Sequence, residues 1–185
     1  MAHGTAAIAV CLPLILLTTA WPAGAANSLP RAASVEVGPG LLAQTSVQQA
    51  ALQRQRAALL YNQGDLAGAA ALLEPSLAAY LEGTDPNQIQ QTASFLGLVY
   101  AELGEAAVSS GNLAAALDYY QQQIDTLAVG FNRAAEVEAL VNASQVATQL
   151  GQSTLAQQYL ETALIIAQEV GNPVLIQQVQ SLLDG

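Results

Sequence analysis

Two pairs of glutamates come closest, in type and spacing, to forming a catalytic site. Glu102 and Glu105 are three residues apart, so on a helix they can share one face, as a general acid and its base must. Glu136 and Glu138 are two residues apart and fall on different faces. The only cysteine is Cys11, and no residue is a lysine.

The only histidine is His3, so the chain beyond Cys11 has no Cys, His or Lys. Thiol nucleophiles, histidine bases, Schiff-base lysines and Cys/His zinc sites are therefore excluded from that part of the chain. With only carboxylates and hydroxyls left, we expect a protein that is not an enzyme and that needs neither a cofactor nor a metal ion.

The charge balance restricts the class of partner. The 4 basic residues, all arginines, face 14 acidic ones, which gives a net charge of −10. Nucleic acids and anionic lipid surfaces are recognised by basic patches, so both are disfavoured. We expect another protein or peptide, neutral or basic, rather than nucleic acid or a small-molecule substrate.

The start of the chain is typical of an export signal. Residues 8–20 read IAVCLPLILLTTA, an apolar run too short to cross a bilayer comfortably as a helix. Small residues follow it and suit cleavage before Ala26 or Asn27, although no Lys or Arg precedes the run. We expect a signal peptide over residues 1–26 and export to a periplasmic, lumenal or secreted location. The alternative is an uncleaved segment that tethers the chain to a membrane.

Residues 27–44 contain two prolines and two glycines and are predicted to be a flexible lead-in. Beyond them, one pattern occurs three times, over residues 64–73, 111–120 and 151–160. Each copy has a glycine and a polar residue, then a small residue five positions after the glycine and bulky residues further on. Such self-similarity predicts stacked helical hairpins and an all-α fold. We expect helices over residues 45–63, 65–82, 86–110, 112–129, 132–150, 153–170 and 173–183.

The spacing of the glycines predicts one long helix. Gly64 to Gly104 is 40 residues, and Gly111 to Gly151 is also 40, with an offset of 7 between the two registers (111 − 104). Seven residues are about two helical turns. We therefore expect helix 86–110 to be the longest and to protrude at one end. Pro75 lies inside helix 65–82 and should kink or shorten it.

The phased copies resemble the tetratricopeptide repeat (TPR) superfamily, in its variant of about 40 residues per repeat. The second copy carries the family's pattern of large, small and aromatic residues at Tyr100, Leu103, Gly104, Ala107, Gly111, Ala116 and Tyr120. Matching residues elsewhere are Ala57, Leu60, Gly64, Ala69 and Leu73, and Leu140, Ser144, Ala147, Gly151, Ala156, Leu160 and Ala163. Gln123 departs from the pattern, because the family has a small residue there.

The resemblance implies a right-handed superhelical stack of three repeats, over residues 45–85, 86–130 and 131–171, closed by a capping helix, 173–183. The TPR domain would then span residues 45–185. Small residues should lie where paired helices approach most closely, namely Gly104, Ala107, Ala116, Ser144, Ala147 and Ala156. The tyrosines Tyr119, Tyr120 and Tyr159 are expected to pack in the core.

The family binds peptides or helices in a concave groove lined by the first helix of each repeat. Carried over by position, the groove comprises Arg54, Tyr61, Asn62, Ala101, Glu105, Val108, Glu138, Val141, Gln145 and Gln149, with Ala58, Ser109 and Thr148 beside them. Only Arg54 and Asn62 resemble the cluster with which some members grip a C-terminal carboxylate, so that mode is disfavoured.

These features predict an exported scaffold that binds a protein partner in its groove and assists the assembly of a complex. One alternative is a self-associating structural module that uses helix 86–110 as its contact. Another is a regulatory segment of a larger signalling or peptidase system.

Overall fold

The computed structural model describes residues 39–184, which form seven α-helices and no strand. The helices are α1 (Pro39–Asn62), α2 (Leu66–Gly83), α3 (Pro86–Ser109), α4 (Leu113–Val129), α5 (Arg133–Gln149), α6 (Ser153–Val170) and α7 (Pro173–Leu183). The predicted signal peptide lies outside the described residues, as does most of the lead-in. Within residues 39–184, no helix combines the length and hydrophobicity needed to cross a bilayer.

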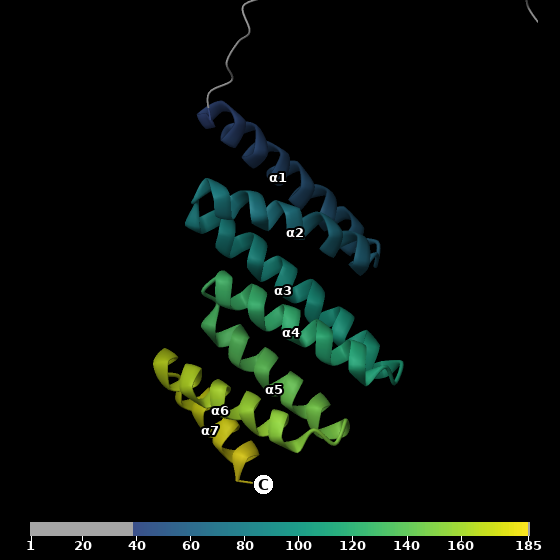
Figure 1. Cartoon of the computed structure of the whole chain (residues 1–185), viewed down its shortest axis with the longest axis vertical. Helices are drawn as coiled ribbons and strands as arrows, with labels where there is room; N and C mark the ends of the chain where they lie inside the picture. Colours follow the sequence, from purple (N-terminus) through teal and green to yellow (C-terminus); the bar gives the residue numbers. More distant parts are fainter. Residues whose placement is uncertain (1–38, 185) are drawn as a thin grey trace, which may run out of the picture. The chain divides into compact units, whose positions relative to one another are not determined.

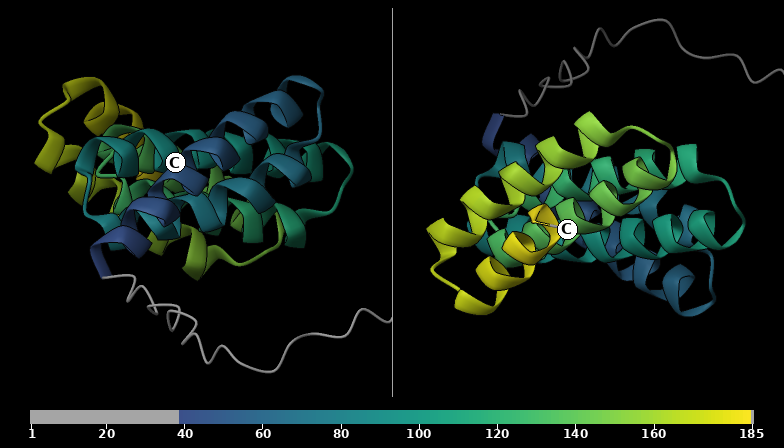
Figure 2. Two further views of the ribbon diagram at one scale, coloured as in Figure 1. Left: turned by 90° about the horizontal axis from the view of Figure 1, so that it is seen from above. Right: turned by 90° about the horizontal axis from the view of Figure 1, so that it is seen from below.

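Each helix packs against the next one in the chain, so the helices follow one another in sequence order from α1 to α7 (Figure 1). The helices form three antiparallel hairpins, α1–α2, α3–α4 and α5–α6, and α7 packs on α6 and α5. Figure 2 shows the hairpins lying over one another when the stack is seen from its ends. The all-α prediction of three hairpins and a closing helix is confirmed.

The tight turns within the hairpins explain the repeated glycines. Gly64, Gly111 and Gly151 have φ of +81°, +76° and +74°, a left-handed conformation that costs glycine little. In each turn, the residue after the glycine donates its backbone N–H to a carbonyl of the preceding helix, at 2.9, 2.9 and 2.8 Å. These three glycines are therefore structurally equivalent, whereas Gly104 lies inside α3.

The prediction that helix 86–110 is the longest is only partly right. α3 has 24 residues, but α1 also has 24, while α5 has 17. The equivalent turn glycines are thus 47 residues apart in the first interval (111 − 64) and 40 in the second (151 − 111). The turn between α3 and α4 reaches beyond the neighbouring turns, as predicted (Figure 1, Figure 2). α1 begins at Pro39 rather than at residue 45, because proline is well suited to the first position of a helix.

In the turn between α4 and α5, an unexpected residue adopts the left-handed backbone conformation. Helix α4 ends before Gly130 as predicted, but Gly130 has an ordinary φ of −78°, and Phe131 adopts the left-handed φ of +53°. A Cβ on Gly130 would lie 2.6 Å from the Cβ of Ala93. Glycine is needed here for the close approach of α3, so the left-handed position falls to a phenylalanine.

Pro75 does not shorten α2, which is continuous from Leu66 to Gly83. The proline is exposed, and the residues on the other face of the helix are buried. Ser76 fixes that face by donating its hydroxyl to the Ala50 carbonyl at 2.9 Å. Packing of the buried face holds the helix together despite the missing backbone hydrogen bond.

The core consists of two clusters that meet at α3. One joins α1, α2 and the first part of α3, and the other joins the end of α3 to α4 through α7. The six small residues predicted at close approaches are all buried. At Gly104, an added Cβ would lie 2.8 Å from Cε1 of Tyr120, which is itself 4% exposed. Tyr119 and Tyr159 are partly buried against the core, in line with the prediction.

Candidate protein-binding face

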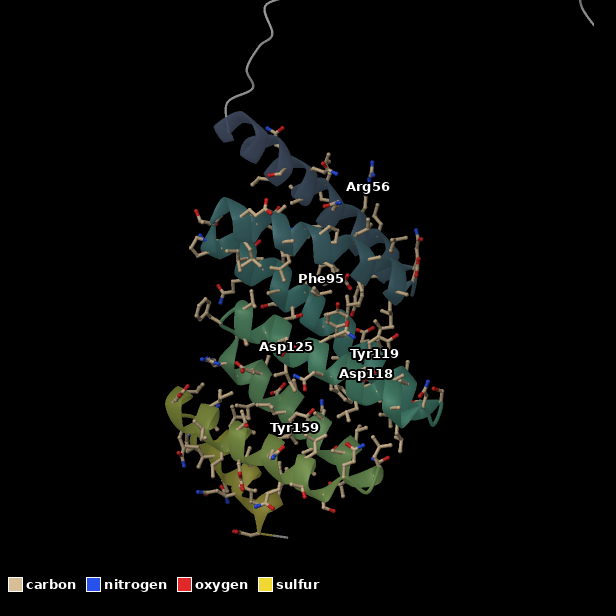
Figure 3. All side chains as sticks on the ribbon, viewed as in Figure 1. Arg56, Phe95, Asp118, Tyr119, Asp125 and Tyr159 are labelled. Atoms are coloured by element: carbon tan, nitrogen blue, oxygen red, sulfur yellow. The ribbon has the colours of Figure 1, made fainter. Side chains whose placement is uncertain are left out.

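The first helices of the first two hairpins, α1 and α3, are joined by side-chain contacts. Arg54 of α1 donates through Nη1 to Gln91 Oε1 and to Thr92 Oγ1 of α3, both at 3.4 Å. The Arg54 guanidinium also lies 5.6 Å from the centre of the Tyr80 ring, within the range of a cation–π contact. Arg56 is exposed and points away from α1 (Figure 3).

Tyr61 makes the second link between α1 and α3. Its ring meets that of Phe95 edge to face, with centroids 5.5 Å apart, and its hydroxyl donates to Glu102 Oε1. This hydrogen bond to a carboxylate raises the pKa of the Tyr61 hydroxyl. Figure 3 marks Phe95 on α3, between α1 and α4. The aromatic pair fixes the position of α3 against α1.

Two hollows lie along these helices. The α1–α3 hollow has a volume of about 350 Å³ and is lined by Arg54, Gln55, Ala58, Gln91 and Phe95. The α3–α5 hollow has about 320 Å³ and is lined by Ser94, Gly97, Leu98, Ala101, Glu105, Gln123, Leu127, Asn132, Ala135, Glu138 and Asn142. We call the surface that carries both hollows the first-helix face.

The predicted groove residues fall into three groups. Those that line a hollow are Arg54 and Ala58 in the first, and Ala101, Glu105 and Glu138 in the second. Those that are exposed on α1, α3 or α5 are Asn62, Ser109, Gln145, Thr148 and Gln149. Those that are partly or fully buried are Tyr61, Val108 and Val141.

Val141 has to be removed from the predicted groove. It is 4% exposed and belongs to the larger core cluster, so a partner could not reach its side chain. α5 lies between α4 and α6 and contacts α7, and it therefore buries residues on more than one side. Val108 is half-buried and packs against the same cluster.

The two glutamate pairs do not act as pairs. Glu102 is engaged by Tyr61 of α1, whereas Glu105 lines the α3–α5 hollow, so the two carboxylates serve different neighbours. Glu136 is buried, and its Oε2 accepts a hydrogen bond from Arg133 Nη1 at 2.9 Å. This bond raises the pKa of the Arg133 guanidinium. Glu138, in contrast, lines the α3–α5 hollow. In residues 39–184, no cluster of Asp, Glu, His or Cys is arranged to hold a metal ion.

Sequence reasoning missed several residues of the first-helix face. Phe95 and Leu98 of α3 line the hollows, and Leu98 is 47% exposed. Both lie at helical spacing from Ala101 and Glu105. Continuing the row of predicted groove residues by two turns towards the start of α3 would therefore have included them. Gln123 could not be found in this way, because it belongs to α4, the second helix of its hairpin.

No protein-family model and no curated protein matches this sequence. Among solved structures, the chain is similar to the N-terminal domain of stress-induced protein-1 (STI-1) from C. elegans. The two share 12% sequence identity and a TM-score of 0.45, over 74% of this chain and 96% of that domain. The fold assignment rests on the helices, turns and contacts described above.

Proposed function

We propose that this protein is a non-catalytic scaffold that binds a segment of another polypeptide along the first-helix face. The observation that carries the proposal is the pair of hollows between successive first helices, which offer both apolar and polar walls. Short side chains such as Ala58 and Ala101 leave room for a docked segment, while Phe95 and Leu98 offer it apolar contact. The resemblance of the repeats to tetratricopeptide repeats supports the same kind of partner.

The proposal includes export, after which the scaffold would assist the assembly of an extracytoplasmic complex. It is supported by the apolar run at residues 8–20 and the small residues that follow. Fractionation of the native host, with mass spectrometry of the recovered chain, tests it. A chain that begins at Ala26 or Asn27 outside the cytoplasm is expected, and an intact chain in the cytoplasm would refute it.

Binding is tested with two matched pairs of variants of the full chain, used as bait for native partners. Arg54→Glu alters the first-helix face, and Arg56→Glu makes the same charge change on an exposed side chain that does not line the α1–α3 hollow. Leu98→Ser removes an exposed leucine of the face, and Ile165→Ser removes an isoleucine of α6 that is 58% exposed. Loss of affinity on the order of ten-fold is expected for the first member of each pair. Equal binding by all four would refute the face as the site.

A second candidate function is self-association, which one specific observation favours. Leu81, Ile89 and Phe131 line an apolar hollow of about 430 Å³ beside the start of α3, and Phe131 is 79% exposed. Phe131 of one copy inserting into this hollow of another would give a symmetric contact. Light scattering decides between the candidates: a mass that rises with concentration, and falls back with Phe131→Ser, would favour self-association.

A further inference from the structure

The side chain of Gln123 is buried without the hydrogen bonds that such a group requires. Gln123 is 8% exposed, and its Oε1 atom has no hydrogen-bond partner. An unpaired buried carbonyl costs on the order of 1–3 kcal/mol. The repeat pattern places a small residue at this position, so a glutamine here raises the question of which donor it serves.

Gln123 lines the α3–α5 hollow together with Glu105 and Glu138. Three helices, α3, α4 and α5, thus each direct at least one acceptor-bearing side chain to the same hollow, and Ser94 and Asn142 also line it. None of the residues that line it is basic. Arg133, the closest arginine in sequence, is held by Glu136 at 2.9 Å. The hollow therefore offers negative charge and an unused acceptor, with no cation of its own among its lining residues.

The remaining walls are suited to an aliphatic stem. Leu98, Ala101 and Ala135 supply apolar surface beside the carboxylates. Asn132, the amide beside these walls, already uses its Nδ2 to donate to Ser94 Oγ at 3.3 Å. Lysine and arginine combine an apolar stem with a cationic group that only donates hydrogen bonds, and this combination matches the walls and the floor of the hollow.

We propose that the α3–α5 hollow receives a lysine or arginine side chain of the bound polypeptide, with Gln123 as the acceptor at its floor. Glu105 and Glu138 balance the charge at the two sides, and rotation of the Gln123 amide about χ3 presents Oε1 to the incoming donor. This inference rests on the proposed function and specifies the chemistry of the partner. The acidity of the whole chain, with a net charge of −10, favours a basic segment at longer range.

The probe for this proposal is a random peptide library displayed on phage and selected on the full chain. Selected peptides are expected to be enriched in Arg or Lys relative to the unselected library. Replacing the selected arginine by citrulline, which keeps the shape and removes the charge, should weaken binding about ten-fold, as loss of a charge-assisted hydrogen bond implies.

The variants Glu105→Gln and Glu138→Gln should each weaken the selected peptides several-fold, and the double variant more than ten-fold. Glu82→Gln, on the exposed end of α2, makes the same charge change and should leave affinity unchanged. Gln123→Met keeps the length of the side chain and removes the acceptor. It should weaken binding while the thermal unfolding midpoint stays the same or rises, because an unpaired polar atom is removed.

The outcomes separate this inference from the proposed function. Peptides that lose affinity with Leu98→Ser, yet show no basic enrichment and no response to the Glu105 and Glu138 variants, would overturn the inference and keep the scaffold. Peptides indifferent to Leu98→Ser and Arg54→Glu, or no selected peptides at all, would overturn both. Binding of basic peptides that survives Gln123→Met would remove Gln123 from the proposal.

Discussion

The contact between Gly104 and Tyr120 shows how a single small residue sets the distance between two helices. Gly104→Val would place new atoms against the ring of Tyr120, starting from a Cβ 2.8 Å from Cε1. The ring is buried in the core, so α3 and α4 would have to separate to make room. We expect a loss of about 2–3 kcal/mol in the free energy of unfolding, measured by urea denaturation.

Ala106→Val is the matched control for this prediction. Ala106 is exposed on the same helix, so the substitution should cost only the difference in helix propensity, about 0.5 kcal/mol. If both variants lose the same small amount, the approach of the two helices at Gly104 is not tight.

Tyr100 is expected to make the free energy of unfolding fall at alkaline pH. Its side chain is 5% exposed and its hydroxyl donates to Glu74 Oε1 at 2.7 Å. Burial first, and then the hydrogen bond to Glu74, raise the pKa of Tyr100 well above its ordinary value of 10.0. The folded state therefore keeps the proton that the unfolded chain releases above pH 10. The stabilisation is complete below that pH and is lost as the pH rises beyond it.

Urea denaturation at a series of pH values tests this prediction. The free energy of unfolding of the wild-type chain should fall above pH 10, with Tyr61, Tyr120 and Tyr159 contributing because their pKa values are also raised. Tyr100→Phe should reduce the alkaline decline by up to about 1.4 kcal/mol per pH unit, the slope for one proton. An equally steep decline in the variant would show that Tyr100 does not titrate as its burial requires.

At the scale of the helix, Pro75 removes one backbone hydrogen bond from α2 without interrupting the helix. It lacks the N–H that the helix would use, yet α2 continues through it on the strength of its buried face. Pro75→Ala restores the donor on an exposed position and should raise the free energy of unfolding by about 1–3 kcal/mol. A lower free energy of unfolding in the variant, measured by urea denaturation, would mean that proline at this position helps α2 to pack against α1.

Most helix boundaries could be predicted because local signals define them. The predicted bounds of α6 and α7 match the structure at every end, since Gly171 and Asn172-Pro173 stop one helix and start the next. The left-handed Phe131 could not be predicted, because it depends on the approach of Ala93 to Gly130, which are distant in sequence. Tertiary contact there overrides the local preference of glycine for that conformation.

Residues of the candidate site could be predicted only on helices that have a single solvent-exposed face. Arg54 and Glu105, carried over from the groove positions of the repeat family that the chain resembles, each line a hollow, and binding of a partner there stays a prediction. Val141 was misplaced because nine residues of α5 are buried, so its helical period does not reveal one exposed face. Gln123 departs from the repeat pattern in the sequence, but its place in the lining of a hollow depends on three helices packed together.

At the scale of the whole described stack, α3 is the element that connects two halves. Ala93, Leu96 and Val99 pack with α1 and α2, whereas Ala107 packs in the cluster that extends to α7. Partly buried Tyr119 contacts both clusters. Each helix mainly contacts its neighbours in the stack. We therefore expect a loss of packing in one cluster to destabilise mainly the helices of that cluster.

Two matched Leu→Ala substitutions test this distribution. Leu73 is 0% exposed in the first cluster, and Leu140 is 2% exposed in the second. Each should cost about 2–5 kcal/mol. Hydrogen exchange with mass spectrometry should then show faster exchange of α1 and α2 in Leu73→Ala, and of α5 to α7 in Leu140→Ala, with the other half still protected. If either variant accelerates exchange equally in all helices, the two clusters unfold as one cooperative unit. In that case α3 transmits the loss of packing along the stack, and a partner bound at one hollow would stabilise the distant hairpin as much as its own.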